Sequence, residues 1–405
     1  MMKKTEEASG KNRSARPLGI YVHYPFCTER CFYCDFLTFP HAETLQAPYI
    51  SALKKEIMHL GQAETKQTSP LLQDAPYFVD SVYFGGGTPS LLPTEELLAV
   101  LETLCANFSF ANDVEITLEV NPGTLTEEGL RRLLSVGVNR FSLGVQTMSD
   151  SLLARLGRTH TAEDVEADIR MLQNAGADNI NVDFLLGLPA QTLADIQKDL
   201  LYVAQWHVQH VSWYSLILEE KTYFHWQAQQ GDLSLPEENL LLQEEDEVLR
   251  TLSSFGYTRY EISNFSLPSY ASRHNRKYWT AEEYLGIGVG AASYLQGERY
   301  QNPSGIHAYI KEVEEGRLPQ QLMERTIKED RFEQVMMGLR LLEGIDREAF
   351  LKRNGMDVLA IAPKSMAKAQ KNGLLCITPT HIAFTRKGLN VQNDVLSDML
   401  WEWEG

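Results

Sequence analysis

Residues 21–36 read YVHYPFCTERCFYCDF, and they place Cys27, Cys31 and Cys34 on one short loop after a β-rich segment. Three thiolates this close along the chain can surround a compact iron–sulfur cluster and bind three of its irons. The remaining iron of a [4Fe–4S] cluster then has no protein ligand, and chemistry at a metal requires such an open position. We therefore expect a [4Fe–4S] cluster on these three cysteines.

A zinc site is the main alternative for this loop. His23 lies four residues before Cys27 and would complete a set of three cysteines and one histidine. However, zinc ligands usually come as two separated pairs, and the pleat of a strand fixes the direction of the His23 side chain. A second alternative is a set of buried, reduced thiols without metal. The sequence favours the cluster over both alternatives.

The other two cysteines and the N-terminus indicate the compartment. An odd total of five cysteines, with no apolar signal segment, argues against a disulfide framework and against secretion. Cys105 and Cys376 stand alone in apolar surroundings, and we expect both to be small buried residues. Residues 1–16 are expected to form a disordered polar tail. No run of about 18 apolar residues would anchor the chain in a membrane, so we expect a cytoplasmic protein.

The charge of the chain limits its partners. A net charge of −17 argues against nucleic acid as a ligand. Residues 310–405 hold 14 Lys and Arg against 15 Asp and Glu, a net charge of −1, so the acidic excess lies in the first 309 residues. The C-terminal part therefore lacks the basic surface that a DNA-binding domain needs.

Strand-like and helix-like segments alternate over the first 220 residues, at the spacing of about 30 residues that βαβ units require. The expected strands are 19–24, 81–84, 115–120, 140–145, 180–185 and 211–218. The expected helices are 94–106, 126–135, 162–173 and 193–205. Polar residues follow most of the strands, and the strand ends of a (β/α) barrel meet at one mouth. We therefore predict an α/β fold with an incomplete (β/α)6-type barrel over residues 17–235.

The alternation stops after residue 235. An acidic helix is expected over 236–255, and irregular or strand-like structure over 257–263, 272–279 and 286–294. We assign residues 236–310 to an extension of the barrel. Helical segments, two short strands around a Pro-Thr turn and a last helix then predict a smaller winged-helix-like α+β domain over residues 311–405, which we interpret as an interaction or lid module.

The motifs together resemble those of the radical S-adenosylmethionine (SAM) superfamily, in particular the oxygen-independent coproporphyrinogen oxidases and their haem-chaperone relatives. The resemblance is carried by YVHYPFCTERCFYCDF (21–36), YFGGGTPS (83–90), EITLEVNPG (115–123), FSLGVQT (141–147), LGRTH (156–160), NVDFLLGLP (181–189) and HNRKYW (274–279). These segments occur in order over about two-thirds of the chain. The resemblance implies a radical SAM barrel with SAM bound at the open iron of the cluster.

The resemblance also implies which residues bind SAM. They are Tyr21, Tyr33, Gly86, Gly87, Thr88, Glu119, Gln146, Arg158 and Asp183. The residue types suit this role, because glycine lets the backbone approach a ligand closely, and an arginine fork matches a carboxylate. Glu119 lies in an interior strand, where a carboxylate needs partners; ribose hydroxyls or a nearby basic side chain would both serve. The glycine run can also be read as a tight βα turn.

Two features separate the oxidase branch from the haem-chaperone branch. The oxidases have a further cysteine two residues after the third, but Phe36 occupies that position here, which argues against coproporphyrinogen decarboxylation. The haem chaperones share this loss and carry an HNxxYW motif, matched by residues 274–279. The resemblance thus implies haem contacts by His274, Asn275, Tyr278 and Trp279. An imidazole is a common axial ligand of haem iron, and Arg276 and Lys277 would meet its propionates. The other reading is a capped loop with Tyr and Trp filling the core.

The sequence therefore predicts a haem chaperone that binds haem and transfers it to acceptor haemoproteins, membrane-bound respiratory enzymes among them. The cluster, SAM and haem are its expected cofactors, and an electron donor is an expected partner. Peripheral contact with a membrane and a homodimer are compatible with the sequence. The alternative is an oxygen-independent coproporphyrinogen III oxidase, or another radical SAM enzyme acting on a tetrapyrrole, so the sequence leaves catalysis open.

Overall fold

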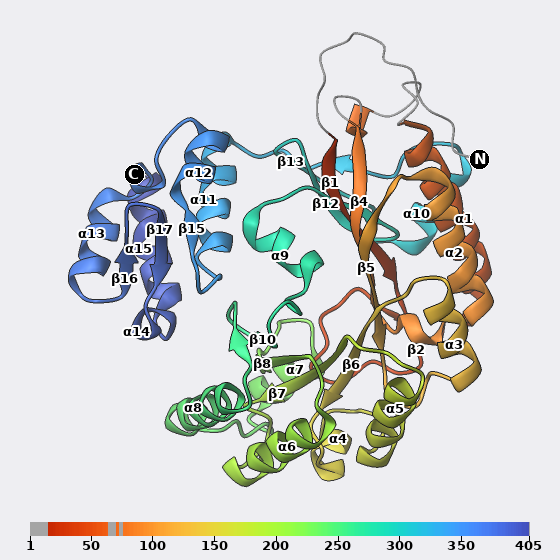
Figure 1. Ribbon diagram of the computed structural model, residues 1–405, viewed down its shortest axis with the longest axis horizontal. Coiled ribbons are helices and arrows are strands. Elements are labelled where there is room, and N and C mark those ends of the chain that lie inside the picture. Colours follow the sequence, from red (N-terminus) through yellow and green to blue (C-terminus); the bar gives the residue numbers. More distant parts are fainter. Residues whose placement is uncertain (1–14, 64–69, 73–75, 405) are drawn as a thin grey trace.

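A curved sheet of parallel strands forms the centre of the computed structural model, which describes residues 15–63, 70–72 and 76–404 (Figure 1). Its six central strands are, in spatial order, β1 (Arg16–Tyr24), β4 (Tyr77–Gly86), β5 (Phe110–Val120), β6 (Arg140–Gln146), β7 (Ile180–Leu186) and β8 (His210–Ser215). On its other side β1 pairs with β11 (Tyr284–Ile287) and not with β8, so the barrel is open. All six expected strands and the incomplete barrel are confirmed. The expected tail, residues 1–16, lies outside the described residues except for its last two.

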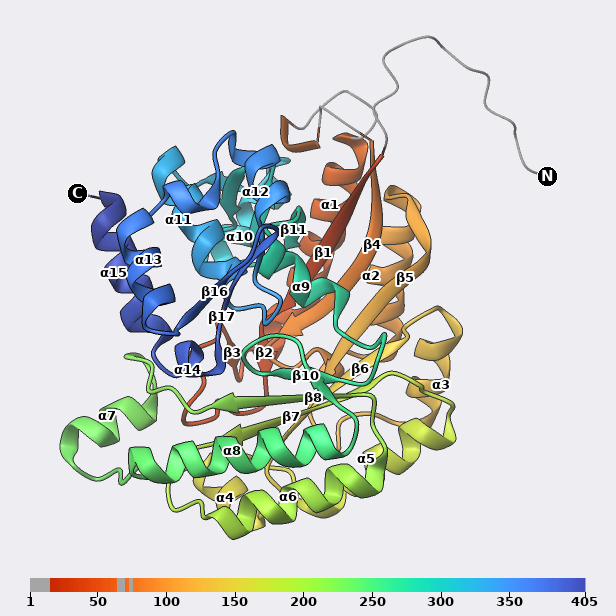
Figure 2. The ribbon, with the colours of Figure 1, turned by 60° about the vertical axis from the view of Figure 1, so that its left-hand side comes forward.

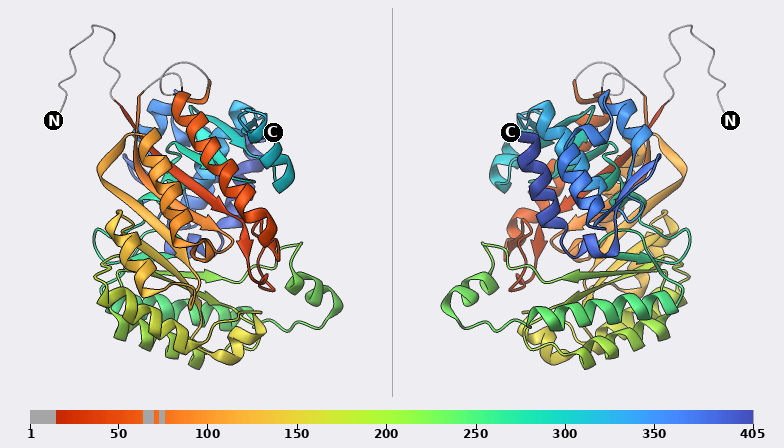
Figure 3. Two further views of the ribbon diagram at one scale, coloured as in Figure 1. Left: turned by 90° about the vertical axis from the view of Figure 1, so that its right-hand side faces the viewer. Right: turned by 90° about the vertical axis from the view of Figure 1, so that its left-hand side faces the viewer.

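Helices cover the outer face of this sheet, with α1 and α2 lying over β1, β4 and β5 (Figures 1 and 3). They are α1 (Gln46–Ala63), α2 (Thr94–Asn107), α3 (Glu127–Ser135), α4 (Asp150–Arg155), α5 (Ala162–Asn174) and α6 (Leu193–Trp206). Local sequence explains where two of them begin. The side chains of Thr161 and Thr192 each accept the backbone N–H of the residue three positions further on. The side chains of Asp164 and Asp195, at those positions, accept the backbone N–H of the threonine. These capping boxes satisfy backbone N–H groups that a helix leaves free at its start.

Short strands extend both edges of the sheet. At the β8 edge, β10 (Asn264–Ser266) and β9 (Thr258–Arg259) pair antiparallel after α7 (Tyr223–Gln230) and α8 (Glu238–Ser254). At the β11 edge follow β12 (Ala292–Leu295), β13 (Glu298–Gln301) and β14 (Gln321–Leu322). The strand-like structure expected over 286–294 is thus present. No helix within the described residues has the length and apolar character to cross a membrane.

Helix α9 (Arg273–Thr280) lies in the concavity of the sheet (Figure 1). The expectation of irregular or strand-like structure over 272–279 is therefore wrong. Aromatic residues favour strands on average, but Ser272 caps this helix by accepting the N–H of Asn275 at 3.3 Å. Contacts with distant parts of the chain, described below, then override the local preference.

The C-terminal domain has its own hydrophobic core, and Figure 2 shows its helices and strands. It consists of α11 (Ile327–Gly338), β15 (Ile345–Asp346), α12 (Arg347–Asn354), α13 (Pro363–Lys371), β16 (Leu375–Ile377), β17 (His381–Phe384), α14 (Arg386–Leu389) and α15 (Gln392–Glu404). Helices with a three-stranded sheet match the predicted winged-helix-like arrangement. The preceding helix α10 (Ile306–Glu314) packs into the core of the barrel, whereas the residues of the second core run from Phe332 onward.

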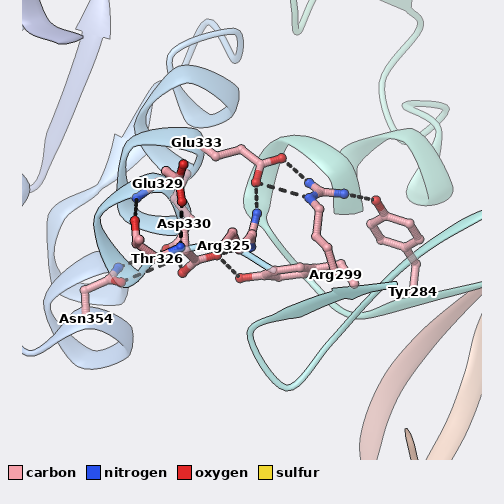
Figure 4. A network of polar contacts seen from close by, with 10 residues as sticks. Tyr284, Arg299, Arg325, Thr326, Glu329, Asp330, Glu333 and Asn354 are labelled. Atoms are coloured by element: carbon pink, nitrogen blue, oxygen red, sulfur yellow. Dashed lines mark hydrogen bonds and ion pairs between the residues drawn. The ribbon is translucent and has the colours of Figure 1, made fainter. Parts of the chain in front are cut away.

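A network of charges joins the two domains (Figure 4). Arg299, on β13, forms an ion pair with Glu333, on α11, and donates to the Tyr284 hydroxyl at 2.6 Å. Arg325 pairs with the same Glu333 and with Asp330. These side chains are mostly buried, so the network resists screening by salt better than surface pairs do.

Candidate cluster and cofactor site

A cavity of about 420 Å³ opens where the central parallel strands end. It is lined by Cys27, Cys31 and Cys34, and by all but one of the residues to which the resemblance assigned SAM contacts: Tyr33, Gly86, Gly87, Thr88, Glu119, Gln146, Arg158 and Asp183. These residues come from the cysteine loop, from β4 to β7 and from the turns that follow, because parallel strands place their carboxyl ends on the same side. Tyr21, the exception, lies beside the cavity and stacks on Tyr83 with ring centroids 6.3 Å apart.

Phe32 holds the cysteine loop in place. Its N–H donates to the Leu156 carbonyl at 3.0 Å, and its carbonyl accepts the N–H of Phe224 at 2.9 Å. Its ring packs on Tyr223 and Phe224 of α7, with centroids 4.9 and 6.1 Å away. The loop is therefore anchored to the structure after β6 and after β8, and its cysteines face the cavity between them.

The three cysteines are partly buried free thiols. Burial raises the pKa of the Cys34 thiol to about 11 and also raises the pKa of Cys27. Both are therefore protonated near neutral pH, and binding to iron would release the protons. Thr88 donates to Cys27 Sγ at 3.4 Å and Arg158 donates to Cys31 Sγ at 3.5 Å, so donors that would stabilise thiolates are already positioned.

The geometry does not suit zinc. Among residues 15–63, 70–72 and 76–404, no three or more His, Cys, Asp or Glu side chains converge on a point that could hold one metal ion. Both ring nitrogens of His23 are also hydrogen-bonded, to the Tyr21 hydroxyl at 3.0 Å and the Leu37 carbonyl at 2.9 Å. A [4Fe–4S] cluster places iron and sulfide between its thiolates, so its protein ligands do not have to converge on one metal ion.

Glu119 is held in the wall of the cavity by groups of the neighbouring strand. Its carboxylate accepts the Tyr83 hydroxyl at 2.9 Å and the Gly86 N–H at 3.2 Å. Burial raises its pKa to about 7. Neither partner is a lysine or arginine, so the salt bridge considered from the sequence is not formed. The sequence analysis missed Tyr83 as a site residue. Tyr83 lies two residues after Ser81, on the same face of β4, and this face points inward.

Arg158 is positioned with one donor to spare. It donates to the Gly144 carbonyl at 2.6 Å and to Asn121 at 3.2 Å, in addition to its contact with Cys31. Its Nε is buried and has no hydrogen-bond partner in the part of the chain that the structure describes. An unpaired buried donor is costly, and the residue that carries it lines the cavity.

Asp183 is held by polar neighbours on β6 and β7. Ser142 and Asn181 donate to its two carboxylate oxygens at 3.0 and 2.8 Å. Burial raises its pKa, as it does for Glu119. Gln146 ends β6 with a backbone φ of 67°, which turns its side chain toward the same cavity. Carboxylate, amide and guanidinium groups thus line the same cavity, as a zwitterionic ligand with hydroxyl groups requires.

The implied haem contacts do not line this cavity. His274 is completely buried, and its ring nitrogens bond to Ser81 at 3.1 Å and to Tyr278 at 2.9 Å. Burial lowers its pKa to about 3. Lys277, which was expected near a propionate, is 2% exposed and pairs with Asp80 and Glu282. In this arrangement the motif forms a capped, buried helix, which is the second of the two interpretations considered from the sequence.

Apolar side chains are exposed at the rim of the cavity. Phe36, at the position of the missing cysteine, is 64% exposed there, and Ile217, after β8, is 66% exposed.

Cys105 and Cys376 are also exposed, so the expectation that they are buried is wrong. The apolar residues near them in sequence belong to helix or strand faces that point inward, whereas these cysteines occupy the opposite faces.

Comparisons with known proteins agree with the site. The model of the radical SAM superfamily matches residues 21–203, and that of the HemN C-terminal domain matches residues 326–391. A heme chaperone HemW of Lactococcus lactis is 34% identical over 95% of this chain and 98% of its own length. The HemW of Bacillus subtilis is 32% identical over 94% and 99%. The solved structure of coproporphyrinogen III oxidase (HemN) from Escherichia coli superposes with a TM-score of 0.79, at 25% identity, over 95% of this chain and 90% of that one.

An open parallel barrel with three cysteines at its mouth defines a radical SAM protein, and this class implies a [4Fe–4S] cluster and SAM as cofactors. Within that superfamily the chain belongs to the HemW family.

Proposed function

We propose that this protein is a haem chaperone, which binds haem and passes it to acceptor haemoproteins. The observation that carries the proposal is a complete radical SAM cavity in a chain that has Phe36 where the oxidases have a further cysteine. Relatives that match almost the whole chain are named heme chaperones. The alternative, an oxygen-independent coproporphyrinogen III oxidase or related radical enzyme, is favoured by the overall similarity to HemN.

Cys27, Cys31 and Cys34 would hold the cluster, and the residues that line the cavity would hold SAM beside it. Gly86, Gly87 and Thr88 offer backbone and hydroxyl groups to the methionine amino group. The carboxylates on β5 and β7 would accept ribose hydroxyls, and the guanidinium of Arg158 would meet a carboxylate or amide acceptor. Once bound, cluster and SAM supply an electron and a reductively cleavable C5′–S bond. The protein orients them and excludes water.

Haem contacts by His274, Asn275, Tyr278 and Trp279 remain a prediction. They require a second arrangement of α9, because both nitrogens of His274 are already bonded and its side chain is completely buried. In that arrangement the imidazole would leave Ser81 and Tyr278 and bind iron. Acceptor haemoproteins, an electron donor, a cytoplasmic location with peripheral contact to membranes, and a homodimer complete the proposal.

The test is an anaerobic titration of the reconstituted protein with haem, followed through the Soret band. We expect saturation at about one haem per chain for the wild type, a weaker or shifted band for His274→Ala, and no change for His307→Ala, since His307 is exposed and far from the motif in sequence. A spectrum that never saturates would exclude the chaperone. Conversion of coproporphyrinogen III to a less carboxylated product, with release of methionine, would establish the oxidase instead.

Binding of SAM is expected to weaken as the pH falls. Burial raises the pKa of Glu119 to about 7, so lower pH converts the carboxylate into a neutral acid, which accepts ribose hydroxyls less well. Between about pH 8 and about pH 6 the affinity should fall by up to roughly tenfold, one factor of ten per pH unit below the pKa. Equilibrium dialysis with labelled SAM measures this change. Glu119→Gln has no titrating group at this position, so its affinity should be lower and should depend less steeply on pH; an equal slope in both proteins would contradict the assignment.

A further inference from the structure

Helix α9 lies between the sheet of the barrel and the C-terminal domain, and its approach to the sheet depends on a glycine. A Cβ on Gly19, in β1, would lie 2.8 Å from Lys277 Cδ and 3.2 Å from His274 Nδ1. Glycine inside a strand often marks such a close approach. The absent side chain lets α9 settle directly on β1 and β4, one layer behind the SAM cavity.

The inner face of α9 supports the wall of that cavity. The His274 ring lies 5.4 Å from the Tyr83 ring, and Tyr83 in turn donates to Glu119 at 2.9 Å. Tyr278 keeps the His274 ring in place through its hydroxyl, 2.9 Å from Nε2. A side chain implied to contact haem thus stands two contacts away from the carboxylate proposed to bind ribose.

The N-terminal end of α9 has a second connection to the cavity. The backbone N–H groups of Arg273 and His274 donate to Glu115, on the same strand as Glu119, at 3.1 and 3.2 Å. The N–H of the capping residue, Ser272, donates to the Tyr260 hydroxyl at 3.3 Å. From Tyr260 a chain of hydrogen bonds runs through His210 and Asn181 to Asp183. Both acidic residues of the cavity wall are therefore linked to this one helix.

The outer face of α9 holds the C-terminal domain. Arg276 donates to Glu343 at 2.6 Å, and Arg353 donates to the Thr280 carbonyl at 2.8 Å. The guanidinium of Arg340 lies over the Trp279 ring, 5.5 Å from its centroid. The last of these contacts is of the cation–π kind, which strengthens when it is shielded from water.

We propose that α9 couples the SAM cavity to the C-terminal domain, with His274 and Tyr278 as positioning residues that act through Tyr83 and Glu119. The inference rests on SAM as the cavity's ligand, and it goes beyond the proposed function by giving the motif a role when no haem is bound. A ligand that fixes Glu119 and Asp183 stabilises the packing of α9 on the sheet. It thereby stabilises the surface of α9 that the C-terminal domain contacts. By linkage, loosening that domain weakens SAM binding by the same factor.

The first test uses the reconstituted full-length protein and Tyr278→Phe, which removes one hydroxyl. We expect SAM to slow amide exchange over residues 326–391 in the wild type. The variant should bind SAM about 5- to 10-fold more weakly, in the range typical of coupled sites, and should lose that protection, while its iron content stays the same. Tyr257→Phe is the matched control, because its buried hydroxyl bonds to the Val208 carbonyl away from the cavity.

The second test starts from the outer face. Arg276→Glu should weaken SAM binding although it is far from the ligand, and Glu343→Arg added to it should restore the affinity, because the pair is re-formed with reversed charges. Rescue by the second substitution would show that the ion pair, and not Arg276 alone, carries the effect on SAM binding. Unchanged SAM affinity in both Tyr278→Phe and Arg276→Glu would overturn the coupling but not the proposed cofactor. SAM binding to the wild type without protection of the C-terminal domain would do the same. A wild type that binds no SAM would overturn the proposed cofactor, and the coupling with it.

Discussion

Replacing Cys31 by alanine is expected to abolish the cluster. Two thiolates cannot hold a four-iron cluster against loss of iron, because each remaining protein ligand binds only one iron. Iron content after anaerobic reconstitution should fall from about four per chain to background, and the broad visible absorbance of the cluster should disappear. Arg158 would also lose the sulfur that it contacts at 3.5 Å. Since SAM binds beside the open iron, its binding should be lost together with the cluster.

Cys105→Ala and Cys376→Ala are the matched controls. Both cysteines are exposed, and neither lines the cavity. They should keep full iron content and the same absorbance as the wild type. A Cys31→Ala protein that still assembles the cluster would show that another residue supplies a ligand, and the assignment of the loop would then be wrong.

Gly87→Ala is expected to impair both halves of the site at once. A Cβ at this position would lie 2.7 Å from the Phe26 carbonyl oxygen and 3.0 Å from Cys27 Sγ. The first neighbour is backbone and cannot rotate away, so the start of the cysteine loop must shift. Overpacking of this kind costs about 1–3 kcal/mol. We therefore expect SAM affinity to fall by about 10- to 100-fold, measured by equilibrium dialysis, and iron content to drop in parallel.

Gly305→Ala serves as the control for that substitution. Gly305 has a backbone φ of −87°, and an added Cβ would meet nothing closer than Ala308 at 3.7 Å. This variant should bind SAM and iron like the wild type. If Gly87→Ala also did so, the close packing of the glycine run against the cysteine loop would not matter for cofactor binding.

The barrel was predictable from the sequence because its signals are local. Each central strand is a run of β-branched, aromatic and other apolar residues, and the helices between begin at threonine caps such as Thr161 and Thr192. Residues 358–372, which belong to the helical segments predicted for the C-terminal domain and read from the sequence as one helix, show the limit of local reading. They form a turn of 3-10 helix followed by α13, because Pro363 disfavours helical backbone at the residue before it.

Residues that act together but lie far apart in sequence were harder to predict. Tyr83 contacts Glu119 and supports His274, yet in the sequence it is one aromatic residue among several in a strand. Tyr21 was expected in the cavity but stands beside it. Its hydroxyl bonds to His23, two residues further along the same face of β1. Which inward-facing side chain reaches a ligand depends on the depth of the strand in the barrel, and alternation alone carries no such information.

The sequence by itself determined the class of site: three cysteines within one loop, and polar residues at the ends of successive strands, which parallel topology must bring to one mouth. Only the tertiary structure decided the place of the HNxxYW motif. Its histidine bonds to Ser81, 193 residues away in the chain, and its helix begins on Glu115. A pattern within one segment cannot encode such contacts, because the packing of distant strands decides whether a polar side chain meets a ligand or is buried behind the site.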